Sequence, residues 1–182
     1  MKSKNCKGCG DKFEPSRPFQ VVCNPQCAIE YSRNKNRTER EKKQRAKTRT
    51  ARELLKTRSD HLKDAQKAFN AYIRQRDALE PCISCGRSTG CKVNAGHYRS
   101  VGAAPHLRFN EENCHLQCEK CNSFLSGNIV EYRPNLIEKI GIDRVEALEN
   151  NNEPAKLSID DIKAIRKEYK NKAKELNKGI VN

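Results

Sequence analysis

The chain has 182 residues and a formal charge of +14, with 5% aromatic residues and no Trp. So few aromatic side chains argue against one large hydrophobic core and favour small modules joined by metal ions and helices. The positive charge predicts an acidic polymer as the partner. A membrane surface is the weaker alternative, because the basic stretches lack the apolar face that an interfacial helix inserts.

The ten cysteines indicate the compartment and the kind of cofactor. The first residues, MKSKNCKGCG, lack the pattern of a signal peptide, and no apolar run is long enough to span a bilayer. These features predict a reducing cytoplasm. In that compartment, paired cysteines bind metal more often than they form disulfides.

Residues 1–30 are predicted to form a zinc ribbon with four cysteine ligands. Two close cysteine pairs flank a short loop that contains proline, and they are Cys6 with Cys9 and Cys23 with Cys27. Four thiolates complete the coordination shell of Zn²⁺, and the free energy of zinc binding can fold a segment this small. The site is therefore predicted to be structural, and unpaired free thiols are the alternative.

Residues 31–80 are predicted to be helical and basic, with one interruption. Between Arg33 and Arg58 there are 12 Lys or Arg and 3 Glu, a net charge of 12 − 3 = +9. A run of one sign repels itself, so we expect it to bind DNA phosphates without base specificity. A solvated helix face is the alternative. The residues predicted to contact DNA here are Lys42, Lys43, Arg45 and Lys47.

A second helix is predicted to begin at Ser59, which would act as N-cap, with Asp60 in the first turn. Pro81 would end it. Its apolar residues recur at helical spacing, so the helix is predicted to pack on the module that follows. These residues are Leu62, Ala65, Phe69, Tyr72, Ile73 and Leu79.

Residues 81–130 contain a second set of paired cysteines. Two C-x₂-C knuckles are predicted to complete one tetrahedral zinc site, from Cys82, Cys85, Cys118 and Cys121. Strands are predicted over 92–98 and 113–117, with a short helix over 118–126. Alternation along the second strand would put Asn113 and His115 on one face and Cys114 on the other.

The residues around these knuckles resemble a known family. The stretch GHYRSVGAAPHLRFNEENCHLQCEKCNSFLSGN resembles the phage NinG (Rap) recombination endonucleases, and the resemblance extends over nearly the whole chain. The order of Cys, His and Asn is also similar to that of zinc-stapled HNH, or ββα-metal, endonucleases. The resemblance implies that His97 is the general base, that Asn113 holds the base or substrate in register, and that Asn122 binds a catalytic Mg²⁺ or Mn²⁺. Phosphodiester hydrolysis uses such a base and such a hard cation.

One position departs from the family pattern. Many members carry Asp or His just before the base, where this chain has Gly96. Either His97 is itself a metal ligand, or another group supplies the contact. His115 is the leading substitute, both as a ligand of the catalytic cation and as a catalytic residue. A structural role for His97 in a zinc-ribbon hairpin is the alternative.

Two arginines flank the loop between the predicted strands. Arg99 and Arg108 are predicted to bind phosphates, because a planar guanidinium pairs with two oxygens. Beyond them, residues 131–182 are predicted to be helical, with two short helices around Gly141 and a linker, NNNEP. A capping box of Ser158 and Asp161 would start the last helix.

These features predict an α+β, mainly α protein with a zinc-bound HNH-like core, an N-terminal zinc ribbon and long basic helices. The resemblance implies a metal-dependent DNA endonuclease that cleaves branched recombination intermediates, such as Holliday junctions and D-loops. Such a preference would come from DNA shape. A homodimer would suit symmetric cleavage of a four-way junction, and other recombination proteins are candidate partners. The alternative is a non-catalytic zinc adaptor of replication or recombination that binds nucleic acid; Gly96 favours it.

Overall fold

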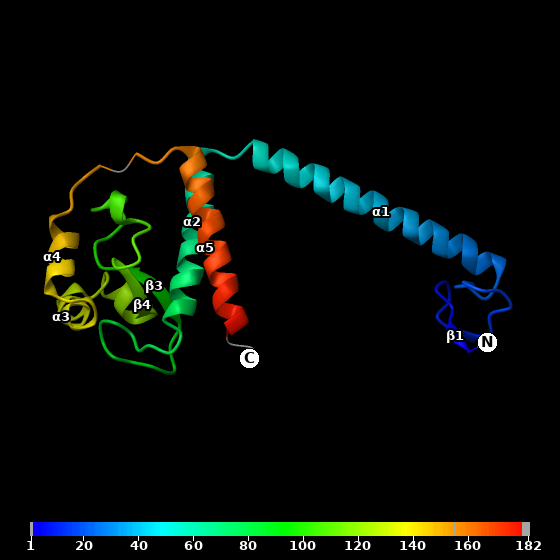
Figure 1. Cartoon of the computed structure of the whole chain (residues 1–182), viewed down its shortest axis with the longest axis horizontal. Coiled ribbons are helices and arrows are strands. Elements are labelled where there is room, and N and C mark those ends of the chain that lie inside the picture. The colour runs from blue at the N-terminus through cyan, green and yellow to red at the C-terminus, as the bar shows by residue number, and fades with distance from the viewer. Residues whose placement is uncertain (1, 155, 180–182) are drawn as a thin grey trace. The chain divides into compact units, whose positions relative to one another are not determined.

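The computed structural model describes residues 2–154 and 156–179, which divide into two compact units on either side of the bond between Lys56 and Thr57. Figure 1 labels the elements in chain order. The described residues are mainly helical and contain two short antiparallel hairpins, which confirms the mixed, mainly helical class. No described helix is both long enough and apolar enough to cross a membrane.

The first unit joins a small hairpin to one long helix. Strands β1 (Lys4–Asn5) and β2 (Lys12–Phe13) pair antiparallel. Helix α1 (Pro25–Leu54) follows, and its N-cap Asn24 accepts a hydrogen bond from the backbone N of Cys27 at 2.8 Å. Every residue from 32 to 55 is exposed. The helix therefore depends on its good helix formers rather than on packing, as the sequence predicts.

The second unit begins with helix α2 (Arg58–Arg76), whose N-cap is Thr57 and not the predicted Ser59. The Thr57 hydroxyl accepts from the backbone N of Asp60, and the Asp60 carboxylate accepts from the backbone N of Thr57. This reciprocal bond requires a spacing of three residues, which Ser59 lacks. Because α2 ends at Arg76, Leu79 lies outside the predicted apolar stripe and is fully exposed.

The hairpin of β3 (Val93–His97) and β4 (Cys114–Cys118) lies between two helical layers (Figure 1). On one side, α2 and α5 (Ile159–Gly179) enclose a cluster whose buried members are Ala68, Phe69, Ile73, Cys114 and Tyr169. On the other side, α3 (Ile129–Ile140) and α4 (Ile142–Asn150) carry a second cluster, which includes Tyr132, Leu136, Val145 and Leu148. The prediction that the second helix packs on the central module is confirmed.

Short helical turns complete this unit. The 3₁₀ turn η1 (Pro105–Leu107) lies in the loop between the strands. The predicted helix over 118–126 is a single π-helical turn, η2 (Lys120–Phe124), and Gly127 follows with a φ of 92°. The predicted capping box of α5 is present, because the Ser158 hydroxyl donates to the Asp161 carboxylate at 2.7 Å and accepts from the backbone N of Asp161 at 3.2 Å.

Candidate functional site

The four cysteines of the first unit meet at one point. The ligand atoms of this set all lie within 4.8 Å of one another, and the set is Cys6, Cys9, Cys23 and Cys27. The Sγ atom of Cys23 is 3.7 Å from that of Cys9 and 3.6 Å from that of Cys27. A tetrahedral zinc ion with metal–sulfur distances of about 2.3 Å gives sulfur–sulfur edges of about 3.8 Å. The cluster therefore has the size of a zinc site.

Backbone amides favour the thiolate form of Cys6 in this cluster. The backbone N atoms of Gly8 and Cys23 each donate to Cys6 Sγ at 3.3 Å. Burial opposes ionisation of the Cys6 thiol, but backbone hydrogen bonds from Cys9, Cys23 and Gly8 outweigh it and lower its pKa to about 6. Gly8 allows the backbone at position 8 to pass close to Cys27, because a β-carbon there would lie 2.8 Å from the carbonyl oxygen of Cys27.

The second four-cysteine cluster fixes one end of the β3–β4 hairpin. Its ligand atoms also lie within 4.8 Å of one another, and its members are Cys82, Cys85, Cys118 and Cys121. The Sγ atoms of Cys85 and Cys118 are 3.8 Å apart, again the edge of a zinc tetrahedron. The backbone N of Cys118 donates to Cys82 Sγ at 3.3 Å. The cluster thus joins the knuckle before β3 to the last residue of β4.

Metal analysis of the purified protein is expected to find two zinc ions per chain. Cys118→Ser should leave one ion and unfold the hairpin, whereas Cys9→Ser should leave one ion with the second unit folded. Zinc release with a colorimetric chelator measures the stoichiometry, and circular dichroism follows folding. The matched control is Cys114→Ser, since this fully buried thiol belongs to neither cluster. One ion in the unmodified protein would reject one of the two sites.

The His97 ring, at the end of β3, is held from three sides. Its Nε2 lies 2.9 Å from the carbonyl oxygen of Arg108, so this nitrogen carries the proton and donates. Its Nδ1 therefore holds the lone pair and faces Cys114 Sγ at 3.8 Å. The ring stacks on Phe69 with 6.0 Å between ring centroids. Burial lowers the pKa of His97 below its ordinary value. The result is a half-buried, neutral imidazole in a fixed tautomer, which is the state a general base requires.

Asn113 is fully buried just before β4, and its side chain clamps the loop between the strands. Its Oδ1 accepts from the backbone N of Arg99 at 2.8 Å, and its Nδ2 donates to the carbonyl oxygens of Arg99 and Leu107. The Arg108 carbonyl that holds His97 directly follows Leu107. Asn113 therefore positions the loop that orients His97, and its side chain is not exposed to a substrate.

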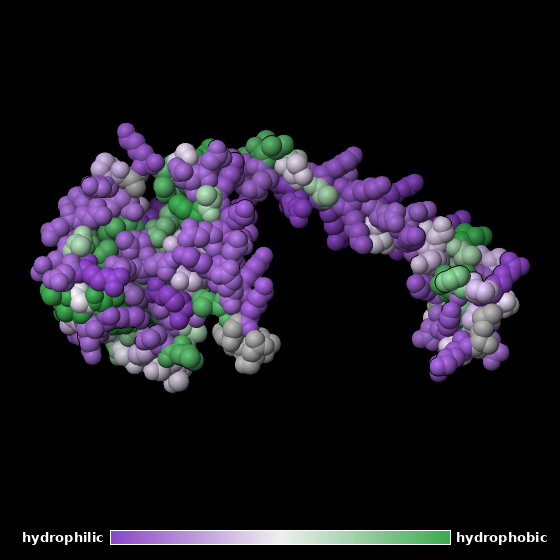
Figure 2. All heavy atoms as spheres, in the orientation of Figure 1, coloured by the Kyte–Doolittle hydropathy of each residue, from purple (hydrophilic) through white to green (hydrophobic). Residues whose placement is uncertain are grey.

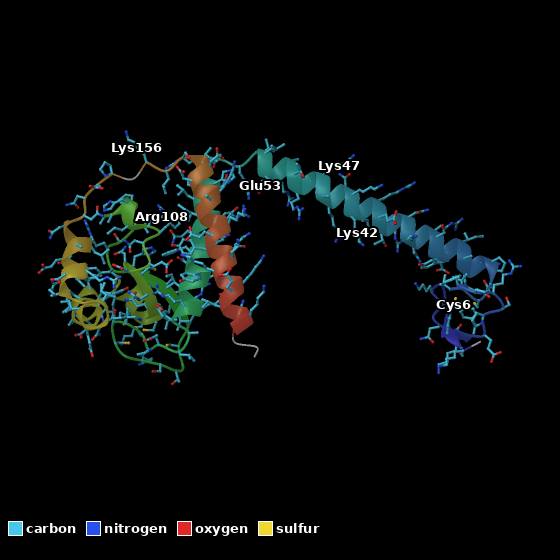
Figure 3. The ribbon with its side chains drawn as sticks, in the orientation of Figure 1. Cys6, Lys42, Lys47, Glu53, Arg108 and Lys156 are labelled. Atoms are coloured by element: carbon cyan, nitrogen blue, oxygen red, sulfur yellow. The ribbon has the colours of Figure 1, made fainter. Side chains whose placement is uncertain are left out.

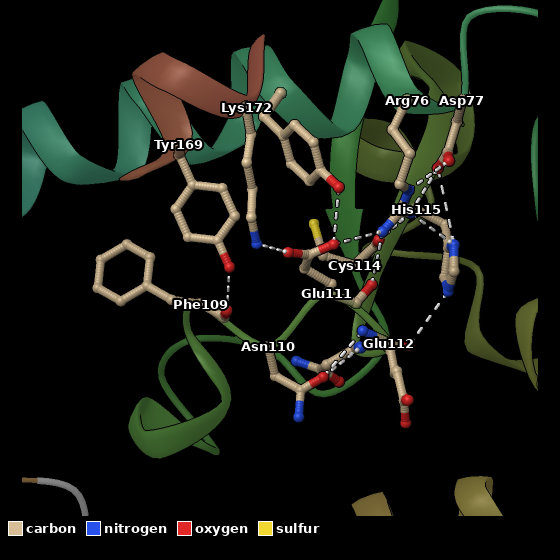
Figure 4. Close-up of polar contacts among 12 residues, drawn as sticks. Arg76, Asp77, Phe109, Asn110, Glu111, Glu112, Cys114, His115, Tyr169 and Lys172 are labelled. Carbon is tan, nitrogen blue, oxygen red and sulfur yellow. Dashed lines mark hydrogen bonds and ion pairs between the residues drawn. The ribbon is translucent and has the colours of Figure 1, made fainter. Parts of the chain in front are cut away.

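His115 lies on the opposite face of the hairpin from His97. His97 pairs with Cys114 and Gly96 pairs with His115, and successive residues of a strand face opposite ways. The His115 ring is buried: its Nε2 donates to the carbonyl oxygen of Glu112 at 3.1 Å, and its Nδ1 lies 3.0 Å from Arg76 Nη2 (Figure 4). The structure thus places His115 in an internal network and not beside His97.

Arg76 and Asp77 form the centre of that network. Arg76 donates to both Asp77 carboxylate oxygens, at 2.6 and 2.8 Å, and to the carbonyl oxygens of Glu111 and Cys114. The Asp77 carboxylate also accepts from the backbone N of Leu116 at 3.0 Å. Burial opposes ionisation of Asp77, but Arg76 and His115 outweigh it and hold its pKa well below the ordinary value. The network fastens the end of α2 to β4.

Asp77→Ala is expected to lower the free energy of unfolding by about 3–5 kcal/mol, because it leaves a partly buried guanidinium without its carboxylate. Chemical denaturation monitored by circular dichroism measures this change. Since the folded-state pKa of Asp77 is depressed, its contribution is present above pH of about 4 and is lost as the pH falls further. Asp160→Ala is the control, because that side chain is 92% exposed. Equal losses in the two variants would contradict the role of the network.

The position before His97 is closed by Gln117. A β-carbon on Gly96 would lie 2.1 Å from Gln117 Oε1 and 2.9 Å from Gln117 Cβ. The Gln117 side chain is fully buried, and its Nε2 donates to Ser84 Oγ and to the carbonyl oxygen of Gly127. A carboxylate at position 96 therefore has no room in this chain. The structural reason for Gly96 is the packing of Gln117.

Asn122 lies in η2, directly after the zinc-cluster residue Cys121. Its Nδ2 lies 3.4 Å from Ser123 Oγ, the side chain is half-buried, and in the part of the chain that the structure describes no hydrogen bond engages its Oδ1. Among the described residues, no hydrogen bond joins Asn122 to His97. The structure therefore leaves Asn122 able to bind a cation but does not bring it into contact with His97.

The two predicted loop arginines differ in their surroundings. Arg99 Nη1 donates to three carbonyl oxygens at the C-terminal end of α4, those of Leu148, Glu149 and Asn151. This places Arg99 as a cap of α4. The Arg108 guanidinium has fewer partners than that of Arg99: its Nη1 donates to Gln66 Oε1 at 3.4 Å. Burial and the charge of nearby Arg58 lower the pKa of Arg108, and two clustered cations of this kind attract anions.

The exposed basic residues lie on two helices. Lys42, Lys43, Arg45 and Lys47 are all exposed on α1, where hydrophilic side chains predominate (Figures 2 and 3). A second basic stripe lies on α5 and lines open grooves along this helix, one of them shared with α2. Its members recur at helical spacing and are Lys163, Arg166, Lys167, Lys170 and Lys174. That helical spacing is the sequence signal for this stripe.

The fold and clusters define a basic, mainly helical protein with two candidate zinc sites. Over residues 1–179 the chain matches the family described as Bacteriophage Lambda NinG protein. It is 41% identical over 189 residues to the protein ninG of Escherichia phage lambda, covering 95% of this chain and 93% of that relative. Identity and coverage are the same for protein ninG of Salmonella phage P22, and identity is 39% for that of Escherichia phage 933W. The chain belongs to the NinG family of phage proteins. No solved structure matches it.

Proposed function

We propose that this protein is a metal-dependent DNA endonuclease that cleaves branched intermediates, such as Holliday junctions and D-loops, during phage recombination in the host cytoplasm. The observation that carries the proposal is the state of His97. A neutral imidazole, oriented by the Arg108 carbonyl and carrying its lone pair on Nδ1 beside Cys114 Sγ, would deprotonate a water molecule that replaces this weak thiol contact and attacks phosphorus.

The surroundings of His97 support an HNH-like core. The antiparallel β3–β4 hairpin is followed by a helical turn, and four cysteines tie the two together. His97, Asn113 and Asn122 occupy positions on this frame that match those of the family pattern. Asn113 acts here through the backbone of the loop, which it holds against Arg99 and Leu107.

The donor set for a catalytic cation is small. Position 96 is closed, and both ring nitrogens of His115 and of His97 have partners. The side-chain oxygen of Asn122 is therefore the candidate protein ligand that remains from the predicted set. Mg²⁺ retains several of its waters when it binds proteins and is often completed by substrate phosphates, which fits one ligand of this kind. When bound, Mg²⁺ or Mn²⁺ would stabilise the negative charge that develops on the phosphate.

Binding to DNA is supported by basic surfaces on both units. The lysines and arginine of α1 supply phosphate contacts without base specificity, and the α5 stripe supplies them on the unit that carries His97. Arg108 adds a positive charge that acts on the base itself, because burial and this charge together lower the pKa of His97. We propose that a homodimer presents two such sites to the two symmetric strands of a four-way junction.

A non-catalytic zinc adaptor of replication or recombination is the second candidate. It is favoured by the closed position at Gly96 and by the burial of Asn113 and His115. Incubation with synthetic linear, forked and four-way DNA, with and without Mg²⁺ or Mn²⁺, separates the two functions. Metal-dependent cleavage of branched DNA supports the nuclease, whereas binding without cleavage under all of these conditions supports the adaptor.

A further inference from the structure

An aromatic side chain projects from the zinc-binding loop of the first unit. Phe19 lies between β2 and α1, and its side chain is 93% exposed. Its neighbours Arg17 and Pro18 are exposed too. A ring of this size offers a large apolar face, and its burial by a partner would be strongly favourable.

The backbone at Phe19 is strained. Residues 17–20 form a turn in which the backbone N of Gln20 donates to the carbonyl oxygen of Arg17 at 3.3 Å. Pro18 occupies the second position, and Phe19 occupies the third with a φ of 65°. Glycine is favoured at such a position, because a β-carbon makes the left-handed region unfavourable. Phe19 therefore lowers the stability of the turn that displays it.

Side-chain hydrogen bonds fix this turn to the metal cluster. Gln20 Oε1 accepts from the backbone N and the hydroxyl of Ser16, at 2.8 and 3.1 Å. Gln20 Nε2 donates to the carbonyl oxygen of Val22 at 2.9 Å, next to the cluster residue Cys23. The Phe19 ring is thus displayed by a fixed turn, and a preorganised ring loses little entropy on binding.

The charge of this unit identifies the kind of partner. Residues 2–56 contain 16 Lys or Arg and 6 Asp or Glu, a net charge of 16 − 6 = +10. A partner that matches this surface is a polyanion that also offers a flat apolar face. A nucleobase in DNA has both properties, because it joins a π-face to a phosphate backbone.

We propose that Phe19 stacks on an unpaired or unstacked base of branched DNA. This inference rests on the DNA binding of the proposed function and extends it to the recognition of the branch point. Bases at a branch are less constrained than those inside a duplex, and apolar side chains that insert between bases exploit such sites. Arg17 is the first residue of the same turn and would contact the adjacent phosphate.

The full-length protein without added Mg²⁺ or Mn²⁺ tests the proposal through binding alone. Phe19→Gly is expected to weaken affinity for a four-way junction about 5- to 150-fold, because stacking on one base accounts for a factor of that order. Affinity for linear duplex should not change. The same substitution removes the strain at position 19, so zinc content should be retained and the thermal midpoint of the first unit should rise. The separate variant Phe19→Tyr should bind the junction as tightly as the unmodified protein, because it keeps an aromatic ring at this position.

The fluorescent base 2-aminopurine at the branch point reports stacking directly. Unmodified protein should change its emission, and Phe19→Gly should not. Leu54→Ala is the matched control, because Leu54 is apolar and 82% exposed but lies on α1. Equal affinity of the Gly variant and the unmodified protein for the junction would overturn the proposal, as would full recovery in Phe19→Leu, which has no π-face. Failure of the unmodified protein to bind any DNA would instead reject the proposed function.

Discussion

His97→Ala is expected to reduce the rate of cleavage of branched DNA by about 10²- to 10⁴-fold. The general base acts in the transition state, so affinity for DNA and the zinc content should be nearly unchanged. The His97 side chain interacts with the Arg108 carbonyl and the Phe69 ring and is not a cluster ligand, so its removal leaves both metal sites intact. Single-turnover cleavage of a labelled four-way junction measures the effect.

The dependence of cleavage on pH provides a second measurement of the same residue. Burial lowers the pKa of His97 below 6.5, and a base must be neutral to accept a proton. The cleavage rate should therefore fall as the pH decreases through the lowered pKa of His97. Above that pKa the rate should not depend on the ionisation of His97. His106→Ala is the matched control, because His106 Nε2 donates to the carbonyl oxygen of Asn151 at 2.8 Å and the ring lies outside the predicted site.

Asn122→Ala distinguishes a cation ligand from a base. It should lower cleavage in a way that higher Mg²⁺ or Mn²⁺ partly reverses, because a weakened site is filled by mass action. His97→Ala should show no such recovery. Normal cleavage by His97→Ala together with loss in His115→Ala would place the base on the other face of the hairpin, where Arg76 and Asp77 hold His115.

The features that the sequence predicted well depend on local spacing. Each zinc cluster follows from the short interval between paired cysteines, and α1 follows from an uninterrupted run of helix formers. The strands predicted over 92–98 and 113–117 agree within one residue at each end with β3 (Val93–His97) and β4 (Cys114–Cys118). In each case the residues that determine the structure are neighbours in the chain.

The features that the sequence missed depend on partners distant in the chain. Arg99 was predicted to bind phosphates from its residue type and position. Its guanidinium instead donates to carbonyl oxygens at the end of α4, about 50 residues further on. His115 was predicted as a cation ligand because Asp77, 38 residues earlier, could not be placed beside it. At Gly96 the sequence shows only that a family metal ligand is absent. The position of the Gln117 side chain explains why glycine occurs there.

Neutralising four charges on α1 is expected to weaken binding to DNA of every shape. Each phosphate contact contributes about 0.9 to the slope of log affinity against log salt concentration for duplex DNA. The four residues are Lys42, Lys43, Arg45 and Lys47. Replacing all four by Gln should therefore reduce the slope by up to about 4. Linear and branched DNA should lose affinity alike, because phosphates carry no sequence and are present in both. Fluorescence anisotropy over a series of salt concentrations measures the slope.

The charge-retaining variant with Lys42→Arg, Lys43→Arg and Lys47→Arg is the matched control and should keep the original slope. Both variants should remain helical, since these side chains are exposed and Gln and Arg are good helix formers. An unchanged slope in the Gln variant would mean that α1 is a solvated connector and that the α5 stripe supplies the phosphate contacts. Gln substitution of Lys167, Lys170 and Lys174 would then be expected to reduce the slope, because the α5 stripe is the other basic helix surface that we propose contacts phosphates.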